Sequence, residues 1–87
     1  MDKRIVLVEW NDAQDHPEKW VDEEDAEKFG EDACMIQSIG FLVRKTDKYV
    51  TLAADWDGVD KDYGRVTKIP TPMVLRIEDL TKMAPKD

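Results

Sequence analysis

The sequence contains very little cysteine, histidine and glycine. Of its 87 residues, Cys34 is the only cysteine, His16 is the only histidine, and four are glycine. One cysteine excludes a disulfide within the chain, and one histidine without a cysteine pair cannot build a zinc site. A glycine-rich phosphate loop, a serine nucleophile elbow and a paired-carboxylate motif are also missing. The sequence therefore predicts a protein that is not an enzyme and that needs no metal and no cofactor.

Long apolar runs and basic stripes are missing as well. No apolar segment approaches the about 20 residues that span a bilayer, and the N-terminus lacks the apolar region and cleavage site of a signal peptide. Basic residues occur as isolated pairs, whereas proteins that bind nucleic acids usually carry a basic stripe. We therefore expect a cytoplasmic protein that neither contacts membranes nor binds nucleic acids directly.

The chain has an excess of negative charge, with 20 acidic and 13 basic residues and a net charge of −7. This balance favours a partner with a basic surface, or serves only to keep the protein in solution. The length allows one domain, which we place at residues 1–80, with a flexible tail at 81–87. A core this small often gains stability by self-association, so we expect a homo-oligomer.

Alternating apolar residues predict a mainly β (α+β) fold. Residues 3–10 alternate between one face with Ile5, Leu7 and Glu9 and another with Val6, Val8 and Trp10. Either the second set lines the core, or both faces are largely covered. Further strands are expected at residues 34–38, 41–45, 49–54, 65–69 and 73–77.

Turn signals separate these strands. Gly40 predicts a bulge or sharp bend, residues 46–48 a hairpin turn, and residues 55–64 a polar loop. Pro70 and Pro72 end the strand expected at residues 65–69. After the last strand, residues 78–80 are expected to leave the sheet as a helical turn or coil. The pattern predicts a small, strongly bent antiparallel barrel of five to six strands.

One short acidic helix is expected at residues 22–29, closed by Gly30. Asp22 is the expected N-cap, and the acidic residues of the first turn favour the positive end of the helix dipole. Val21, Ala26 and Phe29 are expected to form its buried stripe.

Two segments of the chain, Ser38 to Ala53 and Ile69 to Leu80, resemble the Sm-like and SH3-like small β-barrels. Both families place a bent, glycine-bearing strand and a hairpin in the first half and a tight turn before the last strand. The resemblance implies the same kind of barrel here. The Sm signatures for RNA are absent, because no Asp-Gly occupies the turn at residues 46–48 and Ile69-Pro70 replaces the Arg-Gly pair. RNA binding is therefore not expected.

The whole chain also resembles a small hypothetical-protein type found in bacteriophage genomes. The matching segments are residues 8–13, 20–22, 38–43 and 69–80. This resemblance implies a non-enzymatic accessory protein, located in the host cytoplasm, that binds and inhibits or modulates a host protein. An anti-phage defence protein with a basic surface would be such a target.

A partner-binding surface is predicted from charge and aromatic residues. Acidic residues are densest from Glu9 to Asp32, where eleven stand against Lys19 and Lys28. The predicted contact residues are Asp22, Glu23, Glu24, Asp25, Glu27, Trp56 and Tyr63. A charge run of this kind is also typical of a solvated helix face, and the tryptophans Trp10, Trp20 and Trp56 also suit the ends of a small barrel.

Two other functions fit the sequence. In the first, a homo-oligomer sequesters a small nucleotide or signalling molecule, with Arg44, Arg65, Lys68 and Arg76 contacting its phosphates. In the second, the chain is a structural or assembly protein of a virion. Residues 55–62 faintly resemble a calcium loop, but the glycine is misplaced and a solvated turn is the better interpretation. His16 and Cys34 have no orienting partner for catalysis, and we expect a loop histidine and a small core residue.

Overall fold

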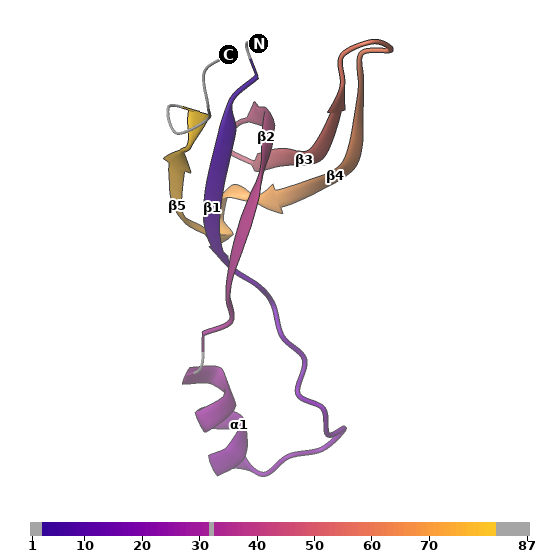
Figure 1. Cartoon of the computed structure of the whole chain (residues 1–87). Coiled ribbons are helices and arrows are strands. Elements are labelled where there is room, and N and C mark those ends of the chain that lie inside the picture. The colour runs from indigo at the N-terminus through magenta and orange to yellow at the C-terminus, as the bar shows by residue number, and fades with distance from the viewer. Residues whose placement is uncertain (1–2, 32, 82–87) are drawn as a thin grey trace.

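The computed structural model describes residues 3–31 and 33–81 and contains one antiparallel sheet and one helix (Figure 1). The strands are β1 (Ile5–Asn11), β2 (Met35–Lys45), β3 (Tyr49–Asp57), β4 (Asp62–Pro70) and β5 (Val74–Asp79). Helix α1 (Glu23–Glu31) interrupts the connection from β1 to β2, and the 3₁₀ turn η1 (Thr71–Met73) joins β4 to β5. The strand order across the sheet is β4-β3-β2-β1-β5.

The core lies on one face of this sheet. Val6, Val8, Val50, Leu52 and Ile69 form its buried cluster, and four partly buried residues pack against it: Trp10, Leu42, Val74 and Ile77. The predicted alternation of β1 is confirmed, because Val6 and Val8 are buried while Ile5 and Leu7 are half-buried on the opposite face. Trp10 is half-buried at the edge of the core and donates its indole N–H to Ser38 Oγ at 3.1 Å.

Strand β2 is one long strand that bends, where two strands were predicted. Its first part pairs with β1 from Met35 to Phe41, and its second part pairs with β3 from Phe41 to Lys45. Gly40 lies at the change of partner, and a Cβ added there would stand 2.6 Å from the backbone oxygen of Ala53. The predicted bend is therefore present, and the close approach of two backbones explains why glycine occupies it. A register shift follows between Leu42 and Arg44.

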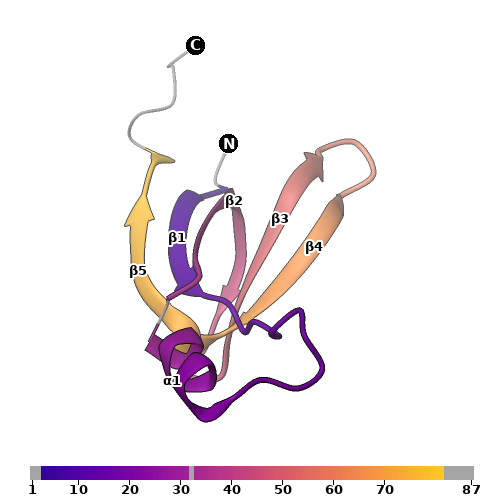
Figure 2. The same ribbon diagram turned by 90° about the horizontal axis from the view of Figure 1, so that it is seen from below.

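The sheet is open, so the structure does not confirm the predicted barrel. Strands β4 and β5 end the strand order, and η1 carries the chain from one to the other without a ladder between them. Figure 2 shows β3 and β4 leaning away from the pair formed by β1 and β2. The fold is mainly β, and the described residues form five strands and one helix.

The predicted loop at residues 55–64 is wrong, because most of it is strand. β3 runs to Asp57 and β4 begins at Asp62, so only a tight turn remains between them. Asp57 Oδ1 accepts hydrogen bonds from the backbone N–H groups of Val59 and Asp60 at 2.9 and 3.2 Å. The carboxylate thus serves as a turn cap, in keeping with the interpretation of a turn over that of a calcium site.

The chain after β4 follows the predicted corner with shifted boundaries. β4 ends at Pro70 as expected, but the last strand begins at Val74 and includes Glu78 and Asp79, which were predicted to leave the sheet. Thr81 lies against β1, since its Oγ1 accepts the backbone N–H of Ile5 at 2.9 Å. Apart from Thr81, the predicted tail lies outside the described residues.

Candidate functional site

The segment between β1 and β2, residues 12–34, forms an arm that projects from the sheet. Its base is closed where the backbone N–H of Asp12 donates to Cys34 O at 2.9 Å, and α1 lies at its far end (Figures 1 and 2). Because of this arm the radius of gyration is 17.0 Å, whereas about 12 Å is expected for a compact chain of this length. Among the described residues of the arm only His16, Val21, Phe29 and Cys34 are half-buried, and the others are exposed.

Local hydrogen bonds and charges explain why α1 forms at this place. Asp22 Oδ1 accepts the backbone N–H of Asp25 at 2.8 Å, which confirms the predicted N-cap. The acidic residues Glu23, Glu24 and Asp25 occupy the first turn, where the helix dipole favours them, and Lys28 pairs with Glu24 at 3.2 Å. Gly30 lies inside the helix, which ends one residue later at Glu31.

The predicted buried stripe of this helix is wrong. No residue of α1 is buried: Ala26 is exposed, and Phe29 is half-buried against His16, with ring centroids 5.0 Å apart. Val21 is half-buried as well, and Trp20 is 85% exposed, so it does not close an end of the sheet. The apolar side chains of the arm have no core beneath them, because the arm projects away from the sheet.

The predicted contact residues do not form one surface. Asp22, Glu23, Glu24, Asp25 and Glu27 are exposed on and beside α1. Trp56 and Tyr63 face each other across the β3–β4 ladder, near the hairpin tip that lies at the opposite end of the molecule from α1 in Figure 1. The predicted contact residues therefore lie on two separate surfaces, at opposite ends of the molecule.

The aromatic pair near the hairpin tip already holds a cation. The rings of Trp56 and Tyr63 are 4.8 Å apart, and Lys3 Nζ lies 4.1 Å from the Trp56 ring centroid. The same ammonium donates a hydrogen bond to Tyr63 Oη at 2.7 Å. The position that a guanidinium of a partner would take over Trp56 is therefore occupied by a lysine of the chain itself.

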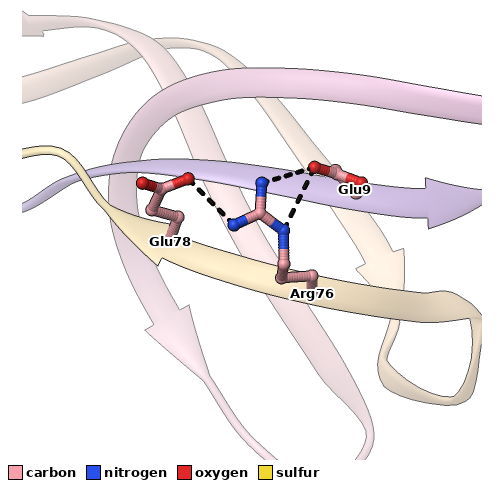
Figure 3. Close-up of polar contacts among 3 residues, drawn as sticks. All are labelled: Glu9, Arg76 and Glu78. Atoms are coloured by element: carbon pink, nitrogen blue, oxygen red, sulfur yellow. Dashed lines mark hydrogen bonds and ion pairs between the residues drawn. The ribbon is translucent and has the colours of Figure 1, made fainter.

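The four basic residues predicted to contact phosphates are also divided. Arg76 donates to Glu9 Oε1 at 2.6 and 3.1 Å and to Glu78 Oε2 at 2.9 Å (Figure 3), and these bonds raise the pKa of its guanidinium. Arg65 donates to both carboxylate oxygens of Asp55 at 2.9 and 3.3 Å. That hydrogen bonding raises the pKa of Arg65 and lowers the pKa of the Asp55 carboxyl. Both guanidinium groups are thus engaged by carboxylates, which removes them from a shared phosphate site.

Arg44 and Lys68, by contrast, line one open hollow of about 260 Å³, which we call the basic hollow. Its other lining residues are Thr46, Lys48, Tyr49 and Thr51, so none of the six is acidic. Lys68 Nζ lies 4.3 Å from the centroid of the Tyr49 ring. Within the described part of the chain, Arg44, Lys48 and Lys68 form no ion pair. The hollow can therefore receive anionic groups beside an aromatic ring.

Hydrogen bonds at the β2–β3 turn hold the floor of this hollow. Thr46 Oγ1 accepts the backbone N–H groups of Lys48 and Tyr49 at 3.2 and 3.1 Å. Thr71 of η1 then ties the turn to the β4–β5 connection, since its Oγ1 donates to Thr46 O at 2.8 Å and its N–H donates to Lys48 O at 2.9 Å. The turn that carries Lys48 and Tyr49 is thus held both by its own hydrogen bonds and by those from Thr71.

A surface that the sequence prediction missed lies on the face of the sheet opposite the core. Residues paired directly in an antiparallel ladder project to the same face, and the pairs Leu7–Ile39, Ile5–Phe41, Phe41–Ala53 and Ala53–Val66 connect four strands. We call this face the outer face and its apolar members the outer stripe: Ile5, Leu7, Ile39, Phe41, Ala53 and Val66. Ile39 is 65% exposed and Val66 54% exposed, whereas Ile5, Leu7 and Phe41 are half-buried and Ala53 is buried. The signal was present in the sequence, because β1 and β2 carry apolar residues at both alternating positions.

The remaining candidates are the lone histidine, the lone cysteine and possible metal ligands. No cluster of three or more metal-ligating side chains exists among residues 3–31 and 33–81. His16 Nδ1 accepts the backbone N–H of Glu18 at 3.0 Å, and Cys34 is half-buried just before β2. In the same ranges, no helix is long and apolar enough to cross a membrane. Comparisons with models of protein families, with curated proteins and with solved structures found no match.

Proposed function

We propose that the protein is a non-enzymatic binding protein whose acidic arm captures a basic surface of a partner protein. The observation that supports this proposal is the helix α1, which has no buried residue and in which only Phe29 is half-buried. Isolated helices shorter than about 12–15 residues are marginal in water, and α1 has nine. A helix of this kind gains stability when a partner covers it, and its charge selects a basic partner.

The charge of the chain is concentrated in this arm. Residues 12–32 contain ten acidic residues against Lys19 and Lys28, a net charge of −8, whereas the rest of the chain has ten acidic and eleven basic residues. Trp20 adds an exposed aromatic side chain beside the helix, and aromatic residues are common anchors of interfaces. A host or defence protein, met in the cytoplasm, is the partner that the sequence resemblance favours.

The fold proposed for this binding protein is an open relative of the SH3-like and Sm-like barrels. Three features support this: the bend of β2 at Gly40, its pairing with both β1 and β3, and the tight turn η1 before the last strand. These are the features on which the sequence resemblance depends.

The first prediction concerns the arm. The triple substitution Glu23→Gln, Glu24→Gln and Glu27→Gln removes three charges but leaves the Asp22 cap in place. We expect it to reduce partner capture from a bacterial lysate at least about tenfold, because each lost charge weakens the attraction and shortens the residence time. Quantitative mass spectrometry of cross-linked complexes measures the effect.

The matched control is Asp57→Asn, Asp60→Asn and Asp62→Asn, which removes the same charge from the hairpin tip. An asparagine at residue 57 still supplies the oxygen that caps the turn. Equal capture by wild type and the arm variant would refute the proposal, as would an equal loss in both variants.

A second candidate function is sequestration of a small nucleotide, and the basic hollow favours it. Arg44, Lys48 and Lys68, which form no ion pair within the described residues, surround Tyr49 and suit a phosphate group attached to a planar base. The second prediction is that AMP shifts the amide NMR signals of residues 46–51 and 68, and that Lys68→Ala weakens this binding at least about fivefold. Shifts that are absent, or unchanged in Lys68→Ala, would rule out the hollow as a nucleotide site.

A further inference from the structure

The outer face of the sheet combines apolar and basic side chains. Tyr49, Thr51 and Ala53 alternate along β3 on this face, opposite the buried Val50 and Leu52. Lys68 and Arg44 both pair with Thr51, so the basic hollow lies directly beside the outer stripe. Within the outer stripe Ile39 and Val66 are exposed, Ile5, Leu7 and Phe41 are half-buried, and Ala53 is buried. Exposed apolar side chains with a charged border mark an interaction site in soluble proteins.

The arm of the same chain has the complementary composition. It carries the net charge of −8, and its apolar side chains Trp20, Val21 and Phe29 lack a core of their own. Within one chain the arm does not cover the outer face, because it leaves the end of β1 and β2 and projects away from the sheet (Figure 1). The chain thus bears two surfaces that match each other but do not meet.

We propose that the outer face of each chain receives the acidic arm of a second copy. In this pairing α1 lies over the basic hollow, with its carboxylates near Arg44, Lys48 and Lys68, and the apolar residues of the arm cover the outer stripe. Each copy has one arm and one face, so a reciprocal exchange closes as a two-fold dimer. The inference rests on the proposed binding function of the arm, and it assigns a second copy of the chain, in place of a host protein, as the molecule that the arm contacts.

The exposed area is large enough for such a contact. The accessible surface of the chain is 7115 Å², whereas a compact monomer of 10.1 kDa exposes about 5,300 Å². The excess of about 1,800 Å² exceeds the about 800 Å² that each partner gives up in a stable interface of standard size. One side of such an interface uses about 20–30 residues, and the segment 12–31 alone is long enough to provide them.

The third prediction is a charge exchange between the two surfaces, measured by sedimentation velocity on the full chain. We expect wild type to dimerise, and to do so more weakly at high salt. Reversing the arm with Glu23→Lys and Glu27→Lys, or the face with Lys48→Glu and Lys68→Glu, should each raise the dimer Kd at least about tenfold. Combining all four substitutions should restore dimerisation, because each reversed arm then meets a reversed face.

The matched control is Asp60→Lys and Asp62→Lys at the hairpin tip, which should leave the Kd within about twofold. A monomeric wild type, or a dimer that neither reversal weakens, would overturn the proposal. So would single reversals that weaken the dimer without rescue in the combined variant, since the arm and the face would then not contact each other.

Hydrogen exchange locates the contact and separates the two proposals. We expect the α1 amides to exchange fast in dilute solution and to become protected as the protein concentration rises. Protection that is independent of concentration would mean that the arm folds onto its own sheet, which overturns the inference. If the chain remains monomeric while the charge-neutralised arm still loses a lysate partner, the second copy is the wrong occupant but the proposed binding function of the arm survives.

Discussion

Among the four glycines, Gly40 is the one whose added Cβ would meet the closest neighbour. Its added Cβ would lie 2.6 Å from Ala53 O and 3.3 Å from Ala53 C, both of which are backbone atoms that cannot rotate away. The fourth prediction is that Gly40→Ala lowers the free energy of unfolding by about 1–3 kcal/mol, as overpacking does in other cores. Urea denaturation measures the difference.

The matched control for this substitution is Gly30→Ala in α1, where a Cβ meets nothing within 4 Å. We expect this variant to leave the stability of the sheet unchanged and to favour the helix, because alanine is the better helix former. A cost below about 0.5 kcal/mol for Gly40→Ala would show that β2 and β3 separate easily at the bend, against the tight approach described above.

Single residues also show where sequence reasoning succeeds and where it stops. Asp22 was identifiable as an N-cap because capping depends on neighbours within one turn. The partners of Arg65 and Arg76 were not identifiable, because Asp55 and Glu9 reach them only through the pairing of different strands. A charge that looks free in the sequence is often neutralised by a residue far along the chain.

At the scale of elements, the arm and the sheet are structurally separate. Asn11 and Met35 pair directly, so β1 and β2 already meet where the arm leaves them. The fifth prediction is that replacing residues 12–34 with Asn-Gly leaves a folded sheet, because a two-residue turn can join these strands and no residue of the core cluster is lost. We expect the free energy of unfolding to change by less than about 1 kcal/mol.

Circular dichroism during urea denaturation tests this replacement, at a concentration low enough to keep the full chain monomeric. A shortened chain that fails to fold, or that unfolds without cooperativity, would show that the arm contributes to the sheet. The full chain under the same conditions is the control.

The sequence predicted whether a segment is strand or helix better than it predicted where that segment begins and ends. The alternation of β1 and the end of β4 at Pro70 follow from local patterns and were confirmed. The loop predicted at residues 55–64 is mostly strand, because pairing between β3 and β4 overrides the low strand propensity of its aspartates and glycine. The buried stripe of α1 was wrong because an amphipathic pattern does not show whether a core lies beneath it.

At the scale of the whole molecule, the arrangement of the candidate sites was not predictable. The sequence places Trp56 and Asp22 in similar acidic surroundings, yet they lie at opposite ends of the structure. It also separates Arg44 from Lys68 by 24 positions, yet both line one hollow. Such relations depend on strand order and register, which local sequence patterns do not reveal.

The length of the molecule also determines which part of its electrostatic field acts on an approaching charged molecule. The structure extends 56 Å along its longest axis, whereas salt at physiological strength screens electrostatic fields within about 8 Å. A molecule that comes near the helix end is therefore affected by the field of the arm alone, and one near the hairpin tip does not sense the arm. No partner experiences the net charge of −7. On an anion-exchange surface we would accordingly expect the protein to be held by its helix end, with the sheet turned towards the solvent.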